Sequence, residues 1–182
     1  ALKELHQTAR ELALKAAYLD EHGAELELSL CPLLCPPAAW AAGGWGGKQR
    51  RAEGMLRFSD APVHKPLCLL EQLAPDEASS KKGLAKLTKE LLSQHKNLLG
   101  YLGCKRSAYP DSLAEEWLTY GATHAEGVCA ELYVGLLKML TPGVTPGTPD
   151  EQTAAKGWEL LIAALSNWPP PPRLADFVAY FV

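Results

Sequence analysis

Four consecutive prolines, residues 169–172, divide the last part of the chain into two segments. Proline lacks a backbone N–H and its ring clashes with the preceding turn, so a helix cannot continue through this run. Before the prolines, apolar residues recur at helical spacing, namely Ala154, Trp158, Leu161, Ile162 and Leu165. After them the pattern resumes with Leu174, Phe177, Val178 and Phe181. The sequence therefore predicts two amphipathic helices, the first ending near Asn167, joined by a proline corner.

Helical spacing also dominates the middle of the chain. Over residues 81–102, leucines fall in one narrow arc at 100° per residue: Leu84, Leu87, Leu91, Leu98 and Leu102. Further helices are predicted over 112–122 and 126–140, with Ser79 or Ser80 and Thr148 or Asp150 as N-caps. Pro66 is expected in the first turn of a short helix, where its missing N–H costs nothing. Because no run has the period of a strand, we predict an all-α fold, a compact helical bundle.

The first 54 residues have a different composition. Apolar residues at alternating steps of three and four form a narrow seam: Leu2, Leu5, Ala9, Leu12, Ala16 and Leu19. This seam fits either a coiled coil that continues upstream or a single amphipathic helix on the domain, and the chain would then be a piece of a longer protein. The Pro- and Gly-rich stretch that follows predicts a loop, which Trp40 and Trp45 either pin to the domain or use to bind a partner. We therefore predict a helix over 1–28, a loop or linker over 29–54 and a helical domain over 55–182.

Charge is unevenly distributed along the chain. Residues 81–106 carry a net charge of +6, residues 107–182 carry -6, and the whole chain carries -3. The basic residues are Lys81, Lys82, Lys86, Lys89, Lys96, Lys105 and Arg106. Four of these lysines lie opposite the leucine arc, with no acidic residue on the same stripe. Such a stripe is typical either of a solvated helix face or of a surface for an acidic partner, and the missing acidic residues favour the second.

Reactive chemistry has little support in the sequence. The five histidines are scattered, and His95, beside Lys96, is expected to face solvent. The five cysteines include one C-x3-C pair, Cys31 and Cys35, without the second pair of ligands that a zinc site needs, so we expect reduced thiols and no metal or cofactor. His124, Glu126 and Cys129 lie close in sequence but lack the context of a nucleophile. We therefore expect no enzyme, no membrane span and no nucleic-acid partner.

Four motifs follow one another in order along the chain. They are Met55-Leu56-Arg57-Phe58 with Pro62 and Lys65-Pro66-Leu67; Leu99-Gly100-Tyr101-Leu102-Gly103; Glu131-Leu132-Tyr133-Val134-Gly135-Leu136-Leu137-Lys138; and Gly157-Trp158-Glu159-Leu160-Leu161 with Trp168-Pro169-Pro170. In this order, residues 55–182 resemble the myosin-tail homology 4 domain, a helical module of unconventional myosin tails and of some plant and algal kinesins. Its signature positions fall on Pro66, Leu67, Glu131, Tyr133, Gly157, Trp158, Trp168 and Pro169. Residues 123–130 depart from the family, being rich in Gly and Ala where it carries Arg and Asp.

This resemblance implies a non-catalytic module that binds microtubules through a basic surface, as part of a motor tail or a microtubule-associated protein. The seven basic residues named above would contact tubulin, whose surface is acidic. The implied partners are tubulin and either an adjacent FERM module or a coiled-coil partner, and the implied location is the cytoplasmic cytoskeleton, including cilia. The alternative is a structural scaffold, for example in a ciliary or axonemal assembly, that contacts other proteins but not tubulin and whose lysines only keep it in solution.

Overall fold

A computed structural model describes residues 33–42, 55–141 and 149–182, and every regular element in these ranges is helical. The elements are α3 (Pro37–Ala41), α4 (Leu70–Leu73), the 3-10 turn η2 (Glu77–Ser79), α5 (Lys81–Tyr101), α6 (Pro110–Thr123), α7 (Glu126–Leu140), α8 (Glu151–Asn167) and α9 (Pro172–Phe181). Because the described residues form no sheet and the helices pack on one another, the prediction of an all-α bundle is confirmed. The helix predicted over 1–28, Cys31 and Trp45 lie outside the described residues.

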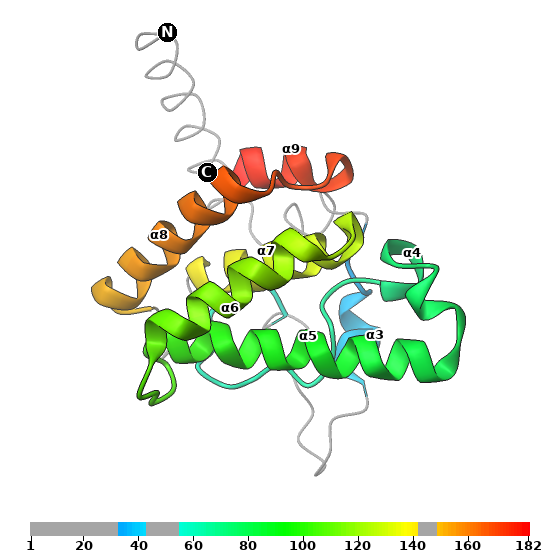
Figure 1. Ribbon diagram of the computed structural model, residues 1–182, viewed down its shortest axis with the longest axis horizontal. Coiled ribbons are helices and arrows are strands. Elements are labelled where there is room, and N and C mark those ends of the chain that lie inside the picture. The colour runs from blue at the N-terminus through cyan, green and yellow to red at the C-terminus, as the bar shows by residue number, and fades with distance from the viewer. Residues whose placement is uncertain (1–32, 43–54, 142–148) are drawn as a thin grey trace, which may run out of the picture.

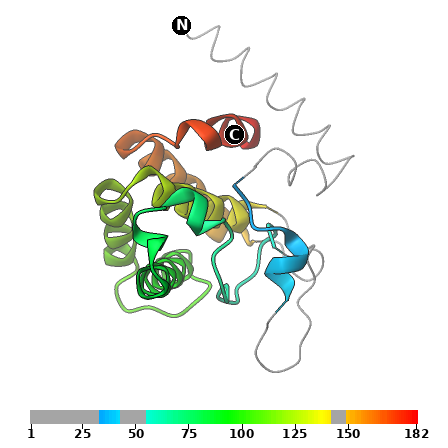
Figure 2. The same cartoon turned by 90° about the vertical axis from the view of Figure 1, so that its right-hand side faces the viewer.

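Helix α7 lies at the centre of the bundle. It contacts α4, α5, α6, α8 and α9, and each of its residues after the first is buried. A helix that is apolar on all sides is stable only when other elements cover it. Helix α5 runs along one edge of the molecule, α6 packs on it and crosses the molecule diagonally, and α8 and α9 lie on the side of α7 away from α5 (Figure 1). Figure 2 shows the same helices from the side.

Local signals place the helix ends as the sequence predicts. The side chain of Ser80 accepts a hydrogen bond from the N–H of Gly83 and caps α5, and Asp150 accepts from the N–H of Thr153 and caps α8. Each bond satisfies one of the N–H groups that a first helical turn leaves unpaired. Helix α8 ends at Asn167, before the proline run. These predictions are confirmed.

The prediction for Pro66 is wrong, because the helix that follows it begins only at Leu70. Between them Leu69 has extended backbone, and Cys68 forms an isolated antiparallel bridge with Leu34. The N–H groups of Leu67 and Cys68 donate to the two carboxylate oxygens of Glu131, at 2.8 and 2.7 Å. These donors hold the chain against α7, and the first helical turn forms only after them.

The segment 33–42 packs on the helices. The N–H of Cys35 donates to the carbonyl of Leu67 at 2.8 Å, and Trp40 is buried. The ring of Trp40 meets that of His64 edge-on, and Nε2 of His64 donates to the Trp40 carbonyl at 3.0 Å. Lys65 donates to the carbonyl of Ala42 at 2.9 Å. Trp40 therefore pins this segment, whereas the boundary between loop and domain near residue 55 stays a prediction.

Polar side chains of α7 hold segments that lie far away in the sequence. Glu131 holds the extended segment after Pro66, as described above. The hydroxyl of Tyr133 donates to the carbonyl of Trp168 at 2.7 Å, and the ammonium of Lys138 donates to the carbonyl of Arg57. Because these side chains are buried, each bond is worth more than the same bond at the surface. Helix α7 thus holds both the segment 57–68 and the proline corner in place.

The proline corner is anchored by the ring of Trp168, which is 6% exposed. Its Nε1–H donates to the carbonyl of Leu118 at 3.1 Å, and its ring lies 5.4 Å from that of Trp117 and 4.8 Å from that of Tyr133, centroid to centroid. Gly121 makes this approach possible, since a Cβ there would lie 2.3 Å from Cζ2 of Trp168. One side chain at the C-terminal end of α8 therefore contacts both α6 and α7.

His95 is buried, contrary to the prediction that it faces solvent; it is 7% exposed. At 100° per residue it follows Leu91 on the packed side of α5, and it lines a small cavity that also includes Glu131. Within the described residues its Nε2 has no hydrogen-bond partner. Burial, with a smaller contribution from the charge of Lys138, lowers the pKa of His95 to about 4. The ring is therefore neutral at pH 7.

We expect the change His95→Leu to reduce the loss of stability on acidification. The folded-state pKa of His95, about 4, lies below the usual 6.5. Its neutral ring therefore makes its full contribution to the free energy of unfolding above pH 6.5, and this contribution is lost as the pH falls through 4. At about 1.4 kcal/mol per pH unit, the variant should lose about 2–3 kcal/mol less than the original protein between pH 7 and 4.5. Urea unfolding of both proteins at the two pH values measures this difference, and equal acid losses would contradict it.

Candidate interaction surface

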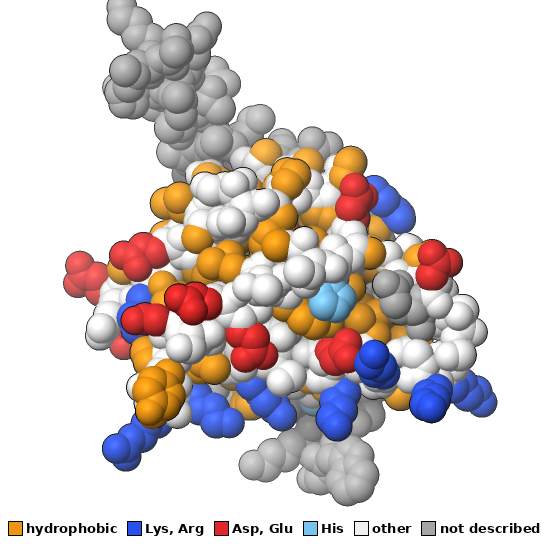
Figure 3. All heavy atoms as spheres, viewed as in Figure 1, with side chains coloured by type: hydrophobic (Ala, Val, Ile, Leu, Met, Phe, Trp, Pro, Cys, Tyr) orange, Lys and Arg blue, Asp and Glu red, His pale blue; other side chains and the backbone are white. Residues whose placement is uncertain are grey.

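The seven basic side chains that the sequence predicts as a binding surface are all exposed, and we call them the basic edge. They are Lys81, Lys82, Lys86, Lys89 and Lys96 on α5, followed by Lys105 and Arg106. Figure 3 shows Lys and Arg side chains gathered along the edge of the molecule that α5 forms. With 21 residues, α5 gives this edge a length of about 30 Å.

The packing of α5 fixes the direction of its lysines. Leu87, Leu91 and Leu98 are buried on the opposite side, where α5 contacts α6 and α7. Beyond the helix, Gly103 has φ +83°, a conformation that favours glycine, and it turns the chain. The N–H of Lys105 then donates to the carbonyl of Leu99 at 3.1 Å. This bond holds Lys105 at the helix end, so the basic edge continues past α5.

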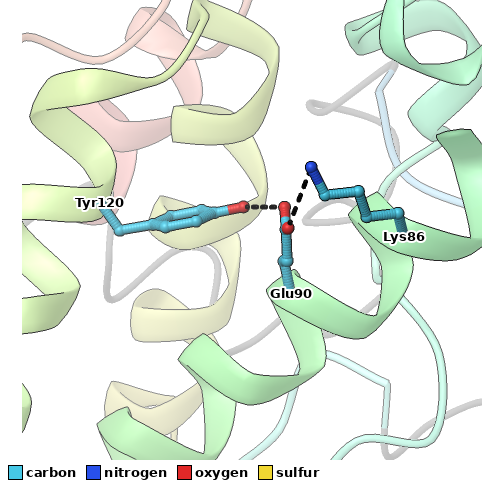
Figure 4. Close-up of polar contacts among 3 residues, drawn as sticks. All are labelled: Lys86, Glu90 and Tyr120. Atoms are coloured by element: carbon cyan, nitrogen blue, oxygen red, sulfur yellow. Dashed lines mark hydrogen bonds and ion pairs between the residues drawn. The ribbon is translucent and has the colours of Figure 1, made fainter.

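One acidic side chain reaches the basic edge. The ammonium of Lys86 lies 3.7 Å from the carboxylate of Glu90, and the hydroxyl of Tyr120 donates to the other carboxylate oxygen at 3.3 Å (Figure 4). The sequence predicts no acidic residue on the stripe, and the pair arises because Glu90 lies one turn after Lys86. Side-chain exposures of 78% and 37% make this a surface pair, worth about 0–1 kcal/mol. Elsewhere in the described residues, no ion pair involves Lys82 or Lys89.

Acidic side chains lie on a different part of the surface. The exposed ones on α6 are Asp111, Glu115 and Glu116, and those on α8 are Glu151 and Glu159. Figure 3 shows acidic groups over α6 and α8, above the row of basic groups. The segregation seen along the sequence therefore persists in space. An approaching polyanion would be attracted to the α5 edge and repelled by the neighbouring faces.

The signature positions lie apart from the basic edge, whereas the Leu99–Gly103 motif overlaps the end of α5. Leu67, Glu131, Tyr133 and Trp168 are buried, and a Cβ on Gly157 would lie 2.6 Å from Cδ2 of Leu140. These five residues hold or closely approach neighbouring elements. Pro66 is partly buried, whereas Trp158 and Pro169 are exposed.

The described residues contain no cluster of three or more His, Cys, Asp or Glu side chains able to hold a metal ion. The thiol of Cys129 donates to the carbonyl of Gly121, whereas His124 stacks on Tyr120 with centroids 3.8 Å apart. Among the helices that the structure describes, none has the length and apolarity to cross a membrane.

Comparison with known proteins links the chain to a myosin. Over 136 residues it is 27% identical to the high molecular weight form of myosin-1 from Acanthamoeba castellanii. The matched segment covers 75% of this chain and 7% of that myosin. No family model matches the chain, and no solved structure matches it. The chain is therefore similar to a small part of a much larger myosin.

Proposed function

We propose that the chain is a non-catalytic cytoskeletal module, of the myosin-tail homology 4 type, that binds microtubules through its basic edge. It would work in the cytoplasm as part of a motor tail or a microtubule-associated protein. The observation that carries the proposal is the row of seven exposed cations along α5 and the turn after it. Similarity to a stretch of a myosin supports the cytoskeletal setting.

Binding would depend on several weak contacts. An exposed ion pair is worth about 0–1 kcal/mol, so a single lysine cannot hold the module on a filament. Side chains spaced along about 30 Å of one helix can meet several carboxylates of an acidic lattice together. Added salt would weaken these contacts, because charges separated by more than about 8–10 Å are screened at 0.1–0.15 M ionic strength.

A scaffold that contacts other proteins but not tubulin is the second candidate function. The observation that favours it is an exposed apolar row on α8, at Trp158, Ile162 and Leu165. Large exposed apolar patches are typical of protein–protein contacts. In this case the basic edge would only keep the protein in solution, and changing its charge would leave partner binding intact.

Reversing three charges on α5 tests the proposal. We expect Lys82→Glu, Lys86→Glu and Lys89→Glu together to abolish co-sedimentation with polymerised tubulin at low salt, because attraction becomes repulsion. The original chain should pellet at low salt and pellet less at moderate salt. All three side chains are exposed, so thermal unfolding should change little and serves as the control for folding. Unchanged pelleting of the variant would instead favour the scaffold.

A further inference from the structure

Helix α8 carries two apolar sides, and only one of them is covered by the described residues. Its buried side consists of Thr153, Gly157, Leu160, Leu161 and Ala164. On its other side, Trp158 is 39% exposed, Ile162 64% and Leu165 37%. We call these three residues the α8 apolar face; at steps of four and three they share one side of the helix.

The α8 apolar face continues onto α9. The ring centroids of Trp158 and Phe181 lie 6.0 Å apart, and Val182 beside it is 51% exposed. Figure 3 shows hydrophobic side chains at the surface over α8 and α9. Apart from Tyr109, the large hydrophobic side chains that are exposed among the described residues all belong to this region. Such a concentration indicates a surface that another apolar element covers.

We infer that residues 1–22 of this chain form an amphipathic helix that docks on the α8 apolar face. Their seam has the composition for it, because leucines at 2, 5, 12 and 19 alternate with alanines at 9 and 16. Small residues within a seam leave room for bulky side chains of a facing helix, such as Trp158 and Ile162. The 22 residues would form a helix about 33 Å long, whereas the face spans about 10 Å between Trp158 and Leu165.

The connection to the described chain is long enough. The described chain before α3, residues 33–36, lies toward α9 in both views (Figure 1, Figure 2). Residues 23–32 are ten in number and can span up to about 33 Å when extended. Helix α9 has ten residues and is about 15 Å long, and its last turn adjoins Trp158. A connection of this length is sufficient to span a distance of two α9 lengths between the described chain and the seam.

Tethering favours this occupant over a second copy of the chain. A segment joined by a short connection is present at an effective concentration near the millimolar range, whereas a second copy is present only at the working protein concentration. The seam of the same chain would therefore occupy the face first in dilute solution. Association of copies through the same seam is the competing outcome that the experiment must separate.

Hydrogen exchange of the intact chain at low micromolar concentration tests the inference. We expect amides of residues 1–22 to exchange at least tenfold faster after Ile162→Asp, because a charge on the α8 apolar face releases the docked helix. Leu12→Asp, which alters the seam instead, should give the same release. Ala122→Asp on α6 is the matched control, since it adds the same charge at an exposed position elsewhere.

Three results would overturn the inference. The first is fast exchange of residues 1–22 in the original chain. The second is protection that persists in both Ile162→Asp and Leu12→Asp. The third is protection that disappears on dilution, which would assign the face to a second copy. Faster exchange of residues 1–22 in both Leu12→Asp and Ile162→Asp, with protection retained in the Ala122→Asp control, would support the inference.

Discussion

Replacing Trp168 with alanine is expected to lower the free energy of unfolding by about 3–5 kcal/mol, more than most single substitutions do. The indole is buried among Trp117, Tyr133 and the backbone at Gly121, and little can move in to fill its volume. The variant also loses the hydrogen bond from Nε1 to the carbonyl of Leu118. Urea unfolding at pH 7 with helical circular dichroism as the signal measures the loss.

Tyr109→Ala is the matched control for this change. Tyr109 is also a large aromatic residue near the end of a helix, but its side chain is 75% exposed. Removing an exposed side chain usually changes stability by no more than about 0.5 kcal/mol. Similar losses for Trp168→Ala and Tyr109→Ala would contradict the role of the tryptophan as the anchor of the proline corner.

Replacing Glu131 with alanine is expected to lower the free energy of unfolding by about 2–6 kcal/mol. The N–H groups of Leu67 and Cys68 are buried and donate to its two carboxylate oxygens, and each donor left without an acceptor costs about 1–3 kcal/mol. Glu131→Gln retains one acceptor oxygen and should recover part of the loss. If the alanine variant is as stable as the original protein, the carboxylate does not hold the extended segment.

The cost of losing Glu131 should also depend on pH. Burial raises the pKa of Glu131 to about 7, although the two backbone N–H donors act to lower it. A raised folded-state pKa means that the contribution to stability is complete below about pH 4.5 and is lost as the pH rises through 7. The difference between the original protein and Glu131→Ala should therefore be about 2–3 kcal/mol larger at pH 5 than at pH 8. Unfolding curves at the two pH values check the sign, and a difference that is larger at pH 8 would contradict it.

The parts of the fold that were predicted correctly depend on local signals. Ser80 and Asp150 each sit immediately before a helical pattern, and the prolines after Trp168 end α8 whatever their surroundings. Capping and proline sterics act over three or four residues, so the sequence displays them directly. The basic edge is visible for the same reason, because its members lie on one helix and the turn after it.

The parts that the sequence did not show depend on distant contacts. Glu131 meets amides more than sixty residues away, and Tyr120 reaches Glu90 across thirty residues. His95 is buried because α6 and α7 both pack on α5, which widens the covered arc beyond the leucines. Pro66 does not begin a helix because Glu131 captures the donors after it. Periodicity carries no information about these partners.

Helix α8 shows a further limit of periodicity. The five apolar residues that mark its pattern are correctly spaced, but among them Leu161 alone is fully buried. The inward side also uses Gly157, because Leu140 of α7 approaches the helix closely there. A helix that is apolar on two sides has two possible orientations, and only tertiary packing selects one. The apolar residues on the side that stays exposed, Trp158, Ile162 and Leu165, form the α8 apolar face.

The affinity for microtubules of two variants with equal net charge tests the central claim most directly. One variant replaces Lys82, Lys86 and Lys89 with glutamine, and the other introduces glutamate at the exposed α6 positions Ser112, Thr119 and Ala122. Each set makes the chain more negative by the same amount. With about 0.5 kcal/mol for each lysine, the first variant should bind polymerised tubulin about tenfold more weakly, and the second should bind like the original chain. Equal weakening of both variants, or no pelleting of the original chain at low salt, would contradict a microtubule-binding basic edge.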